Sequence, residues 1–253
     1  MAMILQRGAA TLLPLMDGSV QCVATSPPYF GQRRYGDLER EIGTGSLYVY
    51  LDELLTVGAE LYRVLADDGV VWLNLADTRA GSGGAGGDWR AGKRGAARRW
   101  RPGPTGLPKG DACLVPQRVA LAFQAELGFL VRSWITWDKA QCRPEDLVRA
   151  RRPGESAETI IMLTKGGPYR FYADRLAERG NVWHIPPARS SRHLAPWPSA
   201  LVEQMVLSAS EPGEVVLDPF SGSHTTARVA DQLGRIGVGI ELYLGTAPEF
   251  AIA

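Results

Sequence analysis

The fold of this chain is indicated by the stretch Val215-Val216-Leu217-Asp218-Pro219-Phe220-Ser221-Gly222-Ser223-His224-Thr225-Thr226. Apolar residues predict a short buried strand, small residues predict a turn, and a helix is expected from about Ser223. In an open α/β sheet, a ligand binds beyond the carboxyl end of such a strand. Gly222 lets the backbone approach that ligand closely, and amide groups at the helix N-terminus can bind a carboxylate.

The next apolar run supports the same site. Residues 236–240 read Ile-Gly-Val-Gly-Ile and end at Glu241, where a carboxylate can bind both hydroxyl groups of a ribose. Together the two strands predict a site for a ligand that carries a ribose and an anionic tail. A turn with so few glycines is weak evidence for any particular cofactor. The alternative is an ordinary strand, turn and helix with a capping serine.

The rest of the chain alternates between short apolar runs and segments of helical periodicity, which is typical of an α/β fold with a mostly parallel sheet. The expected strands are at 20–24, 70–75, 129–137, 159–163, 215–217 and 236–240. The expected helices are at 47–65, 115–127, 198–209 and 223–233, and a turn is expected at 67–69, after the first helix. The length of 253 residues suits one domain. We predict a single domain over residues 1–253, with residues 79–112 as a flexible basic insertion.

The distribution of charge draws attention to this insertion. The net charge of the chain is only +1, but residues 90–109 hold seven basic residues and no acidic residue. The insertion begins with a glycine-rich run, so it cannot bury much surface. A concentrated basic patch is typical of a protein that binds a polyanion. The alternative is a solvated loop with no binding role.

Composition argues against several other classes of protein. The cysteines Cys22, Cys113 and Cys142 are odd in number and far apart, and the histidines do not cluster with them. We therefore expect neither a disulfide framework nor a metal site. No apolar run reaches the roughly 18 residues of a membrane span, and the N-terminal residues do not resemble a signal peptide. The expected location is the cytoplasm, with no membrane partner.

A second segment with chemical potential, Thr25-Ser26-Pro27-Pro28-Tyr29-Phe30, follows the expected strand at 20–24. The two prolines end that strand and carry no amide hydrogen. The Ser26 hydroxyl and the backbone carbonyls can accept hydrogen bonds, and Tyr29 offers a flat ring. This set suits a planar base that carries an amino group. A proline-rich turn after a strand is also common, so the segment alone does not decide the function.

The sequence Ser26-Pro27-Pro28-Tyr29 resembles the catalytic motif of amino-DNA methyltransferases, and the run from Asp218 to Ser223 resembles their motif for S-adenosylmethionine (SAM). The catalytic motif comes first, which is the order of the circularly permuted beta group. Further segments resemble the family at 64–77, 133–139, 158–165, 181–186 and 193–198. The resemblance implies a Rossmann-like, circularly permuted SAM-dependent methyltransferase fold.

The resemblance also implies roles for individual residues. SAM would be the cofactor, and a base would flip out of double-stranded DNA to reach the site. The expected catalytic residues are Ser26, Pro27, Pro28 and Tyr29; Ser26 and the Pro27 carbonyl would accept the amino hydrogens, and Tyr29 or Phe30 would stack on the base. The expected cofactor-binding residues are Asp218, Phe220, Ser221, Gly222, Ser223, Thr225, Thr226, Glu241, Ala195 and Trp197. The expected contacts to DNA phosphates are Arg94, Arg98, Arg99, Arg101, Arg149, Arg151 and Arg152.

Serine as the first motif residue resembles cytosine-N4 enzymes, whereas aspartate is commoner in adenine-N6 enzymes. We therefore predict transfer to cytosine N4, with adenine N6 as the alternative. No cysteine follows a proline here, so methylation at ring carbon 5 is excluded. Related enzymes that act on RNA or on protein amides usually carry asparagine first and the SAM motif ahead of it, unlike this chain. By resemblance a homodimer is plausible.

Two positions depart from the family pattern. His224 stands where the turn usually has glycine, so a side chain there could crowd the cofactor or disturb the turn. Near the N-terminus, Gly8-Ala9 replaces a Gly-Asp pair whose acidic residue helps hold SAM in the family. These departures keep a further hypothesis open, in which the chain is a DNA-binding relic with an impaired cofactor site.

Overall fold

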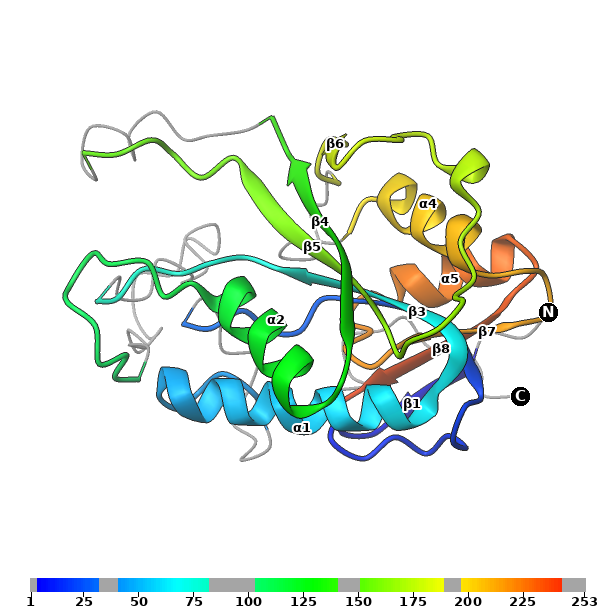
Figure 1. Cartoon of the computed structure of the whole chain (residues 1–253), viewed down its shortest axis with the longest axis horizontal. Coiled ribbons are helices and arrows are strands. Elements are labelled where there is room, and N and C mark those ends of the chain that lie inside the picture. The colour runs from blue at the N-terminus through cyan, green and yellow to red at the C-terminus, as the bar shows by residue number, and fades with distance from the viewer. Residues whose placement is uncertain (1–3, 32–40, 82–102, 141–150, 189–196, 243–253) are drawn as a thin grey trace, which may run out of the picture.

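One eight-stranded sheet organises the protein (Figure 1). The computed structural model describes residues 4–31, 41–81, 103–140, 151–188 and 197–242. The strands are β1 (Ile4–Arg7), β2 (Val20–Thr25), β3 (Leu65–Leu75), β4 (Leu130–Asp138), β5 (Ala157–Thr164), β6 (Val182–His184), β7 (Val215–Asp218) and β8 (Ile236–Glu241). Their order in the sheet is β1-β8-β7-β2-β3-β5-β4-β6. All neighbours are parallel except that β5 runs antiparallel to both β3 and β4, which confirms the predicted α/β class with a mostly parallel sheet.

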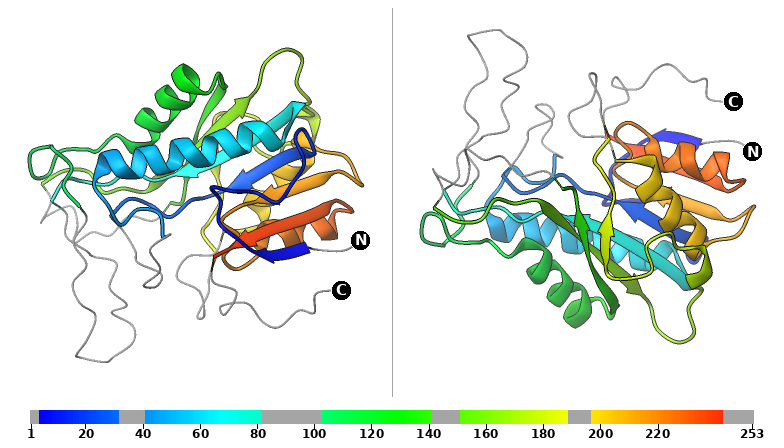
Figure 2. Two further views of the ribbon diagram at one scale, coloured as in Figure 1. Left: turned by 90° about the horizontal axis from the view of Figure 1, so that it is seen from below. Right: turned by 90° about the horizontal axis from the view of Figure 1, so that it is seen from above.

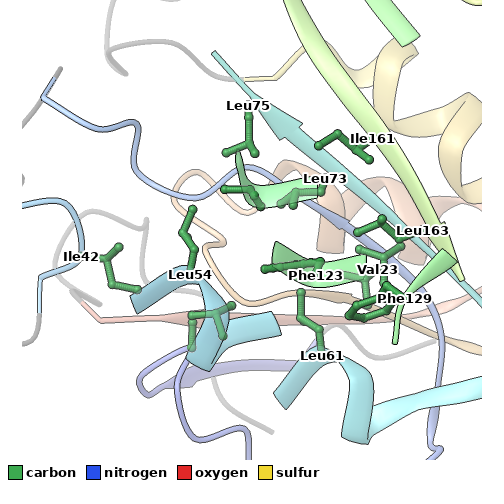
Figure 3. Close-up of a cluster of buried hydrophobic side chains, with 14 of the residues drawn as sticks. Val23, Ile42, Leu54, Leu61, Leu73, Leu75, Phe123, Phe129, Ile161 and Leu163 are labelled. Atoms are coloured by element: carbon green, nitrogen blue, oxygen red, sulfur yellow. The ribbon is translucent and has the colours of Figure 1, made fainter. Parts of the chain in front are cut away.

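Helices cover both faces of the sheet (Figure 2). The helices are α1 (Leu47–Val64), α2 (Val115–Glu126), α4 (Ser199–Ala209) and α5 (Thr225–Gln232). On one face Leu54 and Leu61 of α1 and Phe123 of α2 pack against strand residues such as Leu73 and Ile161 (Figure 3). On the other face a second apolar cluster contains residues of α4 and α5 together with the rings of Trp72, Trp137 and Trp183. Burial of these two layers supplies the main favourable term in folding.

The observed elements agree with most of the predicted ones, and the differences lie at their ends and at the sheet edges. The expected turn at 67–69 is instead part of β3, which begins at Leu65 immediately after α1 and pairs there with Val20. Helix α5 begins at Thr225 rather than at Ser223. Strands β1 and β6 were not predicted, because they have only 4 and 3 residues and lie at the two edges of the sheet. Their pairing partners, and not their own sequence patterns, define them as strands.

Helix α5 lies unusually close to β8. A Cβ atom on Gly237 of β8 would lie 2.2 Å from the Ala227 carbonyl oxygen and 2.8 Å from the Ala227 carbonyl carbon. These are backbone atoms of the helix, so they cannot rotate away. The absence of a side chain at Gly237 therefore sets the distance between the helix and the strand.

The described ends of the predicted insertion 79–112 are held together by backbone hydrogen bonds. The Ala80 amide donates to the Asp111 carbonyl at 2.9 Å, and the Gly110 amide donates to the Ala80 carbonyl at 2.8 Å. Ala80 is buried, and Leu107 packs against the core of α1 and α2. These ends are thus more firmly packed than the prediction implied, while residues 82–102 lie outside the described residues. None of the helices in the described ranges combines the length and the apolar character needed to cross a bilayer.

The topology brings several strand ends to one edge of the sheet. The carboxyl ends of parallel strands lie at the same edge of a sheet. Thr25, Asp218 and Glu241 are the last residues of the neighbouring strands β2, β7 and β8, so they lie at one edge. Because β5 runs in the opposite direction, its first residues also lie at this edge. We refer to it below as the carboxyl edge.

Candidate active site

The two segments selected from the sequence meet at the carboxyl edge. The Thr25 hydroxyl at the end of β2 donates to Asp218 Oδ1 at the end of β7, at 2.7 Å. The Thr226 hydroxyl in the first turn of α5 donates to Asp218 Oδ2 at 2.9 Å and contacts the Ala24 carbonyl at 3.2 Å. Thr25 and Thr226 are both buried. Asp218 therefore connects the Ser-Pro-Pro-Tyr loop to the turn that begins α5.

The turn after β7 is fixed by hydrogen bonds to β8. The Ser221 amide donates to the Ile240 carbonyl at 3.0 Å, and the Gly222 amide donates to Glu241 Oε2 at 2.7 Å. The other Glu241 oxygen accepts from the Leu242 amide at 2.9 Å. Gly222 adopts a φ of 48°, in the left-handed region that glycine tolerates best. Glu241 thus holds the turn in place and lies next to an exposed glycine backbone.

His224 keeps the turn in the shape that glycine would give it. Its φ of 59° and ψ of 29° are left-handed, and it is the N-cap residue of α5. The ring is buried, and its Nδ1 lies 2.8 Å from the Ser221 hydroxyl oxygen. A non-glycine residue in this conformation costs about 1–3 kcal/mol. The ring contact with Ser221 offsets part of that cost, so the side chain is accommodated without loss of the left-handed turn.

Asp218 is a buried carboxylate surrounded by neutral donors. It accepts hydrogen bonds from the Thr25 and Thr226 hydroxyls and from the Phe220 amide, and within the described part of the chain it forms no ion pair. Burial raises the pKa of Asp218 to about 6, and the three hydrogen bonds lower it only in part. A cationic ligand placed next to this carboxylate would relieve the cost of its charge.

We expect the free energy of unfolding of an Asp218→Asn variant, relative to that of the wild type, to increase with pH. Below about pH 4 the carboxyl is protonated in both the folded and the unfolded chain, so its buried charge costs nothing. As the pH rises towards the folded-state pKa of about 6, the unfolded chain loses its proton first and the wild type loses stability. The gain of the variant over the wild type should therefore increase with pH, by up to about 3 kcal/mol at 1.36 kcal/mol per pH unit.

The measurement is the free energy of unfolding in urea for both proteins from about pH 4.5 to about pH 8. Other titrating groups are common to the two chains and cancel in the difference. The lost acceptor oxygen lowers the stability of the variant by a constant amount and does not alter the slope. A difference that stays constant over this range would contradict the assignment of a raised pKa to Asp218.

The Ser-Pro-Pro-Tyr loop presents two acceptors. The hydroxyl of Tyr50 donates to the Pro28 carbonyl at 2.8 Å, which occupies that oxygen. No hydrogen bond from the described residues reaches the Pro27 carbonyl, and Ser26 is only half-buried. Phe30 is fully buried, and its ring lies 5.5 Å from the ring of Tyr50 between centroids. Phe30 is therefore not available for stacking, which leaves Tyr29 as the ring of this loop that remains partly exposed.

A polar network that the sequence reasoning missed lies behind Tyr29. The Tyr29 hydroxyl donates to Glu158 Oε2 at 2.6 Å, and Asn74 Nδ2 lies 2.7 Å from the Tyr29 oxygen and 2.8 Å from Glu158 Oε2. Lys139 Nζ forms an ion pair with Glu158 Oε1 at 2.5 Å. Burial and the nearby Glu158 raise the pKa of Tyr29 well above its ordinary value, so the phenol stays protonated. Asn74 inside an apolar run and Glu158 just before one were the available signals.

Three of the remaining predicted residues, Arg151, Arg152 and Trp197, lie in the described part of the chain. Arg152 donates to Glu155 Oε1 at 2.7 Å, and Arg79 contacts the same oxygen at 2.9 Å. Arg151 is exposed, with a φ of 54°. Trp197 packs against the apolar cluster of α4 and α5. The predicted residues that lie outside the described residues are Arg94, Arg98, Arg99, Arg101, Arg149 and Ala195.

The described residues include no group of three or more histidine, cysteine or acidic side chains placed to hold a metal ion. Cys22 and Cys113 are both buried free thiols. Burial raises the pKa of Cys22 to about 12, so this thiol is not a nucleophile.

Comparison with known proteins gives a consistent result. A family model described as DNA methylase, of N6/N4 type, matches residues 20–249. The type II methyltransferase M.Cfr9I of Citrobacter freundii is 38% identical over 245 residues, which cover 92% of this chain and 80% of that protein. The match to the family model thus includes both the Ser-Pro-Pro-Tyr loop and the turn after β7.

Two solved structures share the fold. The cytosine-N4-specific PvuII DNA methyltransferase matches with a TM-score of 0.70 and 21% identity, covering 94% of this chain and 81% of the other. A putative DNA modification methylase of Thermus thermophilus, solved with S-adenosyl-L-methionine, matches with a TM-score of 0.64 and 27% identity, covering 96% and 89%.

Proposed function

Since this chain belongs to the DNA methylase family of N6/N4 type, we propose that it transfers a methyl group from SAM to the exocyclic N4 of a flipped-out cytosine in double-stranded DNA. The proposal includes methylation at a specific DNA site by a type II methyltransferase, which is the class that the name of M.Cfr9I gives for that relative. The alternative acceptor is adenine N6. The circularly permuted order of motifs, the single domain and a homodimer are parts of the same proposal.

One observation carries the proposal: the loop with the acceptors and the turn for the cofactor are joined by a direct hydrogen bond. The 2.7 Å contact between Thr25 and Asp218 connects residues 193 positions apart in the sequence. It places Ser26 directly beside the carboxyl end of β7. Methyl transfer requires the acceptor nitrogen and the methyl group to be held in line, and this arrangement supplies such positioning.

The residues of the turn suit SAM. SAM, when bound, supplies an electrophilic methyl group on a sulfonium ion. Glu241 offers a carboxylate to ribose hydroxyls, and the exposed Gly222 backbone allows close approach. The buried carboxylate of Asp218 lacks a cationic partner among the described residues, which suits a positively charged ligand. We assign the cofactor site to these residues together with Phe220, Ser221, Ser223, Thr225, Thr226, Ala195 and Trp197.

The Ser-Pro-Pro-Tyr loop suits an aromatic amino group. The lone pair of such a nitrogen is delocalised into the ring, so the nitrogen is a poor nucleophile. Ser26 and the Pro27 carbonyl can accept its two hydrogens and favour a tetrahedral nitrogen with a localised lone pair. The Pro28 carbonyl is already occupied by Tyr50, which supports the assignment of this role to Pro27. Preorganised acceptors of this kind act mainly through electrostatics and geometry.

The choice of cytosine over adenine rests on Ser26 as the first motif residue. The PvuII enzyme, which shares this fold, is cytosine-N4-specific. Contacts to the DNA backbone are assigned to the predicted arginines, of which Arg151 and Arg152 lie in the described part of the chain and the others outside it. They offset the cost of base flipping, which is a few kcal/mol.

The test is expression in a bacterial host that lacks DNA methylation, followed by digestion of the DNA to nucleosides and mass spectrometry, with a Ser26→Ala variant as control. The expected result is N4-methylcytosine in the wild type and far less of it in the variant. N6-methyladenine would keep the mechanism and change the base.

The absence of both modified bases would overturn the proposal, and calorimetry would then distinguish its two replacements. A purified protein that still binds SAM would have another substrate, such as RNA or a protein amide. A protein with no heat of binding at millimolar SAM would be a relic, as the replacement of the family's acidic residue by Ala9 suggests.

A further inference from the structure

The network behind Tyr29 has a defined direction. A carboxylate that is paired with an ammonium group can only accept hydrogen bonds. Glu158 is such a carboxylate, because Lys139 contacts its Oε1. The Tyr29 hydroxyl and the Asn74 amide nitrogen must therefore both donate to Glu158 Oε2. This requirement also fixes the orientation of the Asn74 amide group.

The direction continues to Ser26. Tyr29 has a single hydroxyl proton, and the hydrogen bond to Glu158 uses it. The Tyr29 oxygen can then only accept, and it does so from Asn74 Nδ2 at 2.7 Å and from the Ser26 hydroxyl at 3.2 Å. The single proton of Ser26 is thus directed towards Tyr29, and the lone pairs of its oxygen are left for another partner.

This direction matters because an isolated serine hydroxyl can rotate. If it donated to the amino nitrogen of a base, it would occupy the lone pair that has to attack the methyl group. If it accepts an N–H bond instead, it leaves that lone pair free. We infer that Glu158, acting through the Tyr29 hydroxyl, is a positioning residue that holds Ser26 as a hydrogen-bond acceptor towards the amino group of the target base. The inference rests on the proposed function.

Burial and charge strengthen the orientation of the Ser26 hydroxyl by Glu158 and Tyr29. Asn74 is fully buried and the Glu158 side chain is 12% exposed, so water competes little for these hydrogen bonds. Hydrogen bonds to an ionised group are shorter and stronger than neutral ones, and each bond in a chain polarises the next. The carboxylate of Glu158 thereby makes the Ser26 oxygen a better acceptor, while Tyr29 and Ser26 stand between the charge and the base.

The kinetic test compares Glu158→Gln and Tyr29→Phe with the wild type. The glutamine amide can donate to Tyr29 and so reverse the chain, whereas phenylalanine keeps the ring and removes the relay. Each variant should lower the single-turnover rate constant by about 10-fold, as expected for loss of one hydrogen bond, with unchanged Kd values for SAM and for DNA. The double variant should be no slower than either single variant, because both remove the same chain.

The matched control is Asp138→Asn. Asp138 is the last residue of β4, next to Lys139 in the sequence, and its Oδ2 lies 3.0 Å from His184 Nδ1. The variant therefore removes one carboxylate from the same edge of the sheet without changing a contact of Tyr29. Its rate constant should stay within about twofold of the wild type. Multiplicative effects in the double variant, or equal losses in the control, would overturn the inference.

A second measurement does not depend on activity. In protein labelled with ¹³C at tyrosine Cζ, one of the eight tyrosine signals should vanish in Tyr29→Phe and should shift in Glu158→Gln, because the Cζ shift reports the hydrogen bonds of the phenol. An unshifted signal would overturn the inference by itself. If the wild type methylated no DNA, the proposed function would be wrong, and this signal would still decide whether the chain from Glu158 to Tyr29 exists.

Discussion

Replacing Ser26 with alanine is expected to lower the single-turnover rate constant for methyl transfer by about 10²–10³-fold, the usual loss for one preorganised group at a transition state. The Ser26 hydroxyl is half-exposed at the end of β2 and contacts Tyr29 at 3.2 Å. It takes no part in the apolar core or in the Thr25–Asp218 contact. Its removal should therefore leave the fold and the Kd for SAM unchanged.

The measurement is a rapid-quench assay at saturating SAM on unmethylated DNA, with calorimetry for SAM binding. Ser19→Ala is the matched control, because the Ser19 hydroxyl is exposed and donates only to the nearby Met16 carbonyl at 2.7 Å. A rate constant within about fivefold of the wild type would show that Ser26 is not the acceptor. A parallel loss of SAM affinity would show that the residue acts on the cofactor site instead.

Gly237→Ala is expected to lower the free energy of unfolding by about 3 kcal/mol, at the upper end of the usual cost of overpacking. The added methyl group would lie 2.2 Å from the Ala227 carbonyl oxygen, so the whole of α5 has to move away from β8. Thr226 immediately precedes Ala227 in α5, so that movement should also disturb the hydrogen bond between Thr226 and Asp218. The variant should thus bind SAM more weakly as well as unfold more easily.

Urea unfolding followed by circular dichroism measures the first effect, and calorimetry measures the second. Gly180→Ala is the control, since a Cβ at Gly180 meets no atom within 4 Å. That variant should be neutral or stabilised by up to about 1 kcal/mol. A loss of less than about 0.5 kcal/mol in Gly237→Ala would mean that α5 is not held at this distance in solution.

The fold could be predicted where local pattern and tertiary structure agree. The apolar runs of β2, β7 and β8 are followed by or end in polar residues, so the sequence singles out Ser26, Asp218 and Glu241 as candidates, and the structure brings the ends of these strands to one edge of the sheet. Strands β1 and β6 could not be found, because three or four residues carry no reliable pattern. Residues 67–69 read as a turn but lie in β3, where β3 begins by pairing Leu65 with Val20.

Candidate residues at the ends of β2, β7 and β8 could be named from the sequence, whereas the network behind Tyr29 could not. Lys139 and Glu158 were seen as parts of strands that resemble the family, without a role. The contacts of Glu158 with Lys139 and with Tyr29 depend on β5 running antiparallel between β3 and β4, and no local signal gives that order. His224 shows the converse case. Its side chain was a warning in the sequence, but the backbone adopts the left-handed turn with the ring turned onto Ser221.

The pairing of β1 with β8 determines when a growing chain can acquire its cofactor site. The ribosome adds about 5–20 residues per second, so Asp218 follows Thr25, 193 positions earlier, by about 10–40 s. Until β8 has been made, β1 has no neighbouring strand and β7 is paired on one side only, with β2. Open strand edges pair readily with other chains. Translation that stops before residue 236 should therefore yield aggregating fragments rather than a partly active enzyme, and methylation should depend on chains completed through β8.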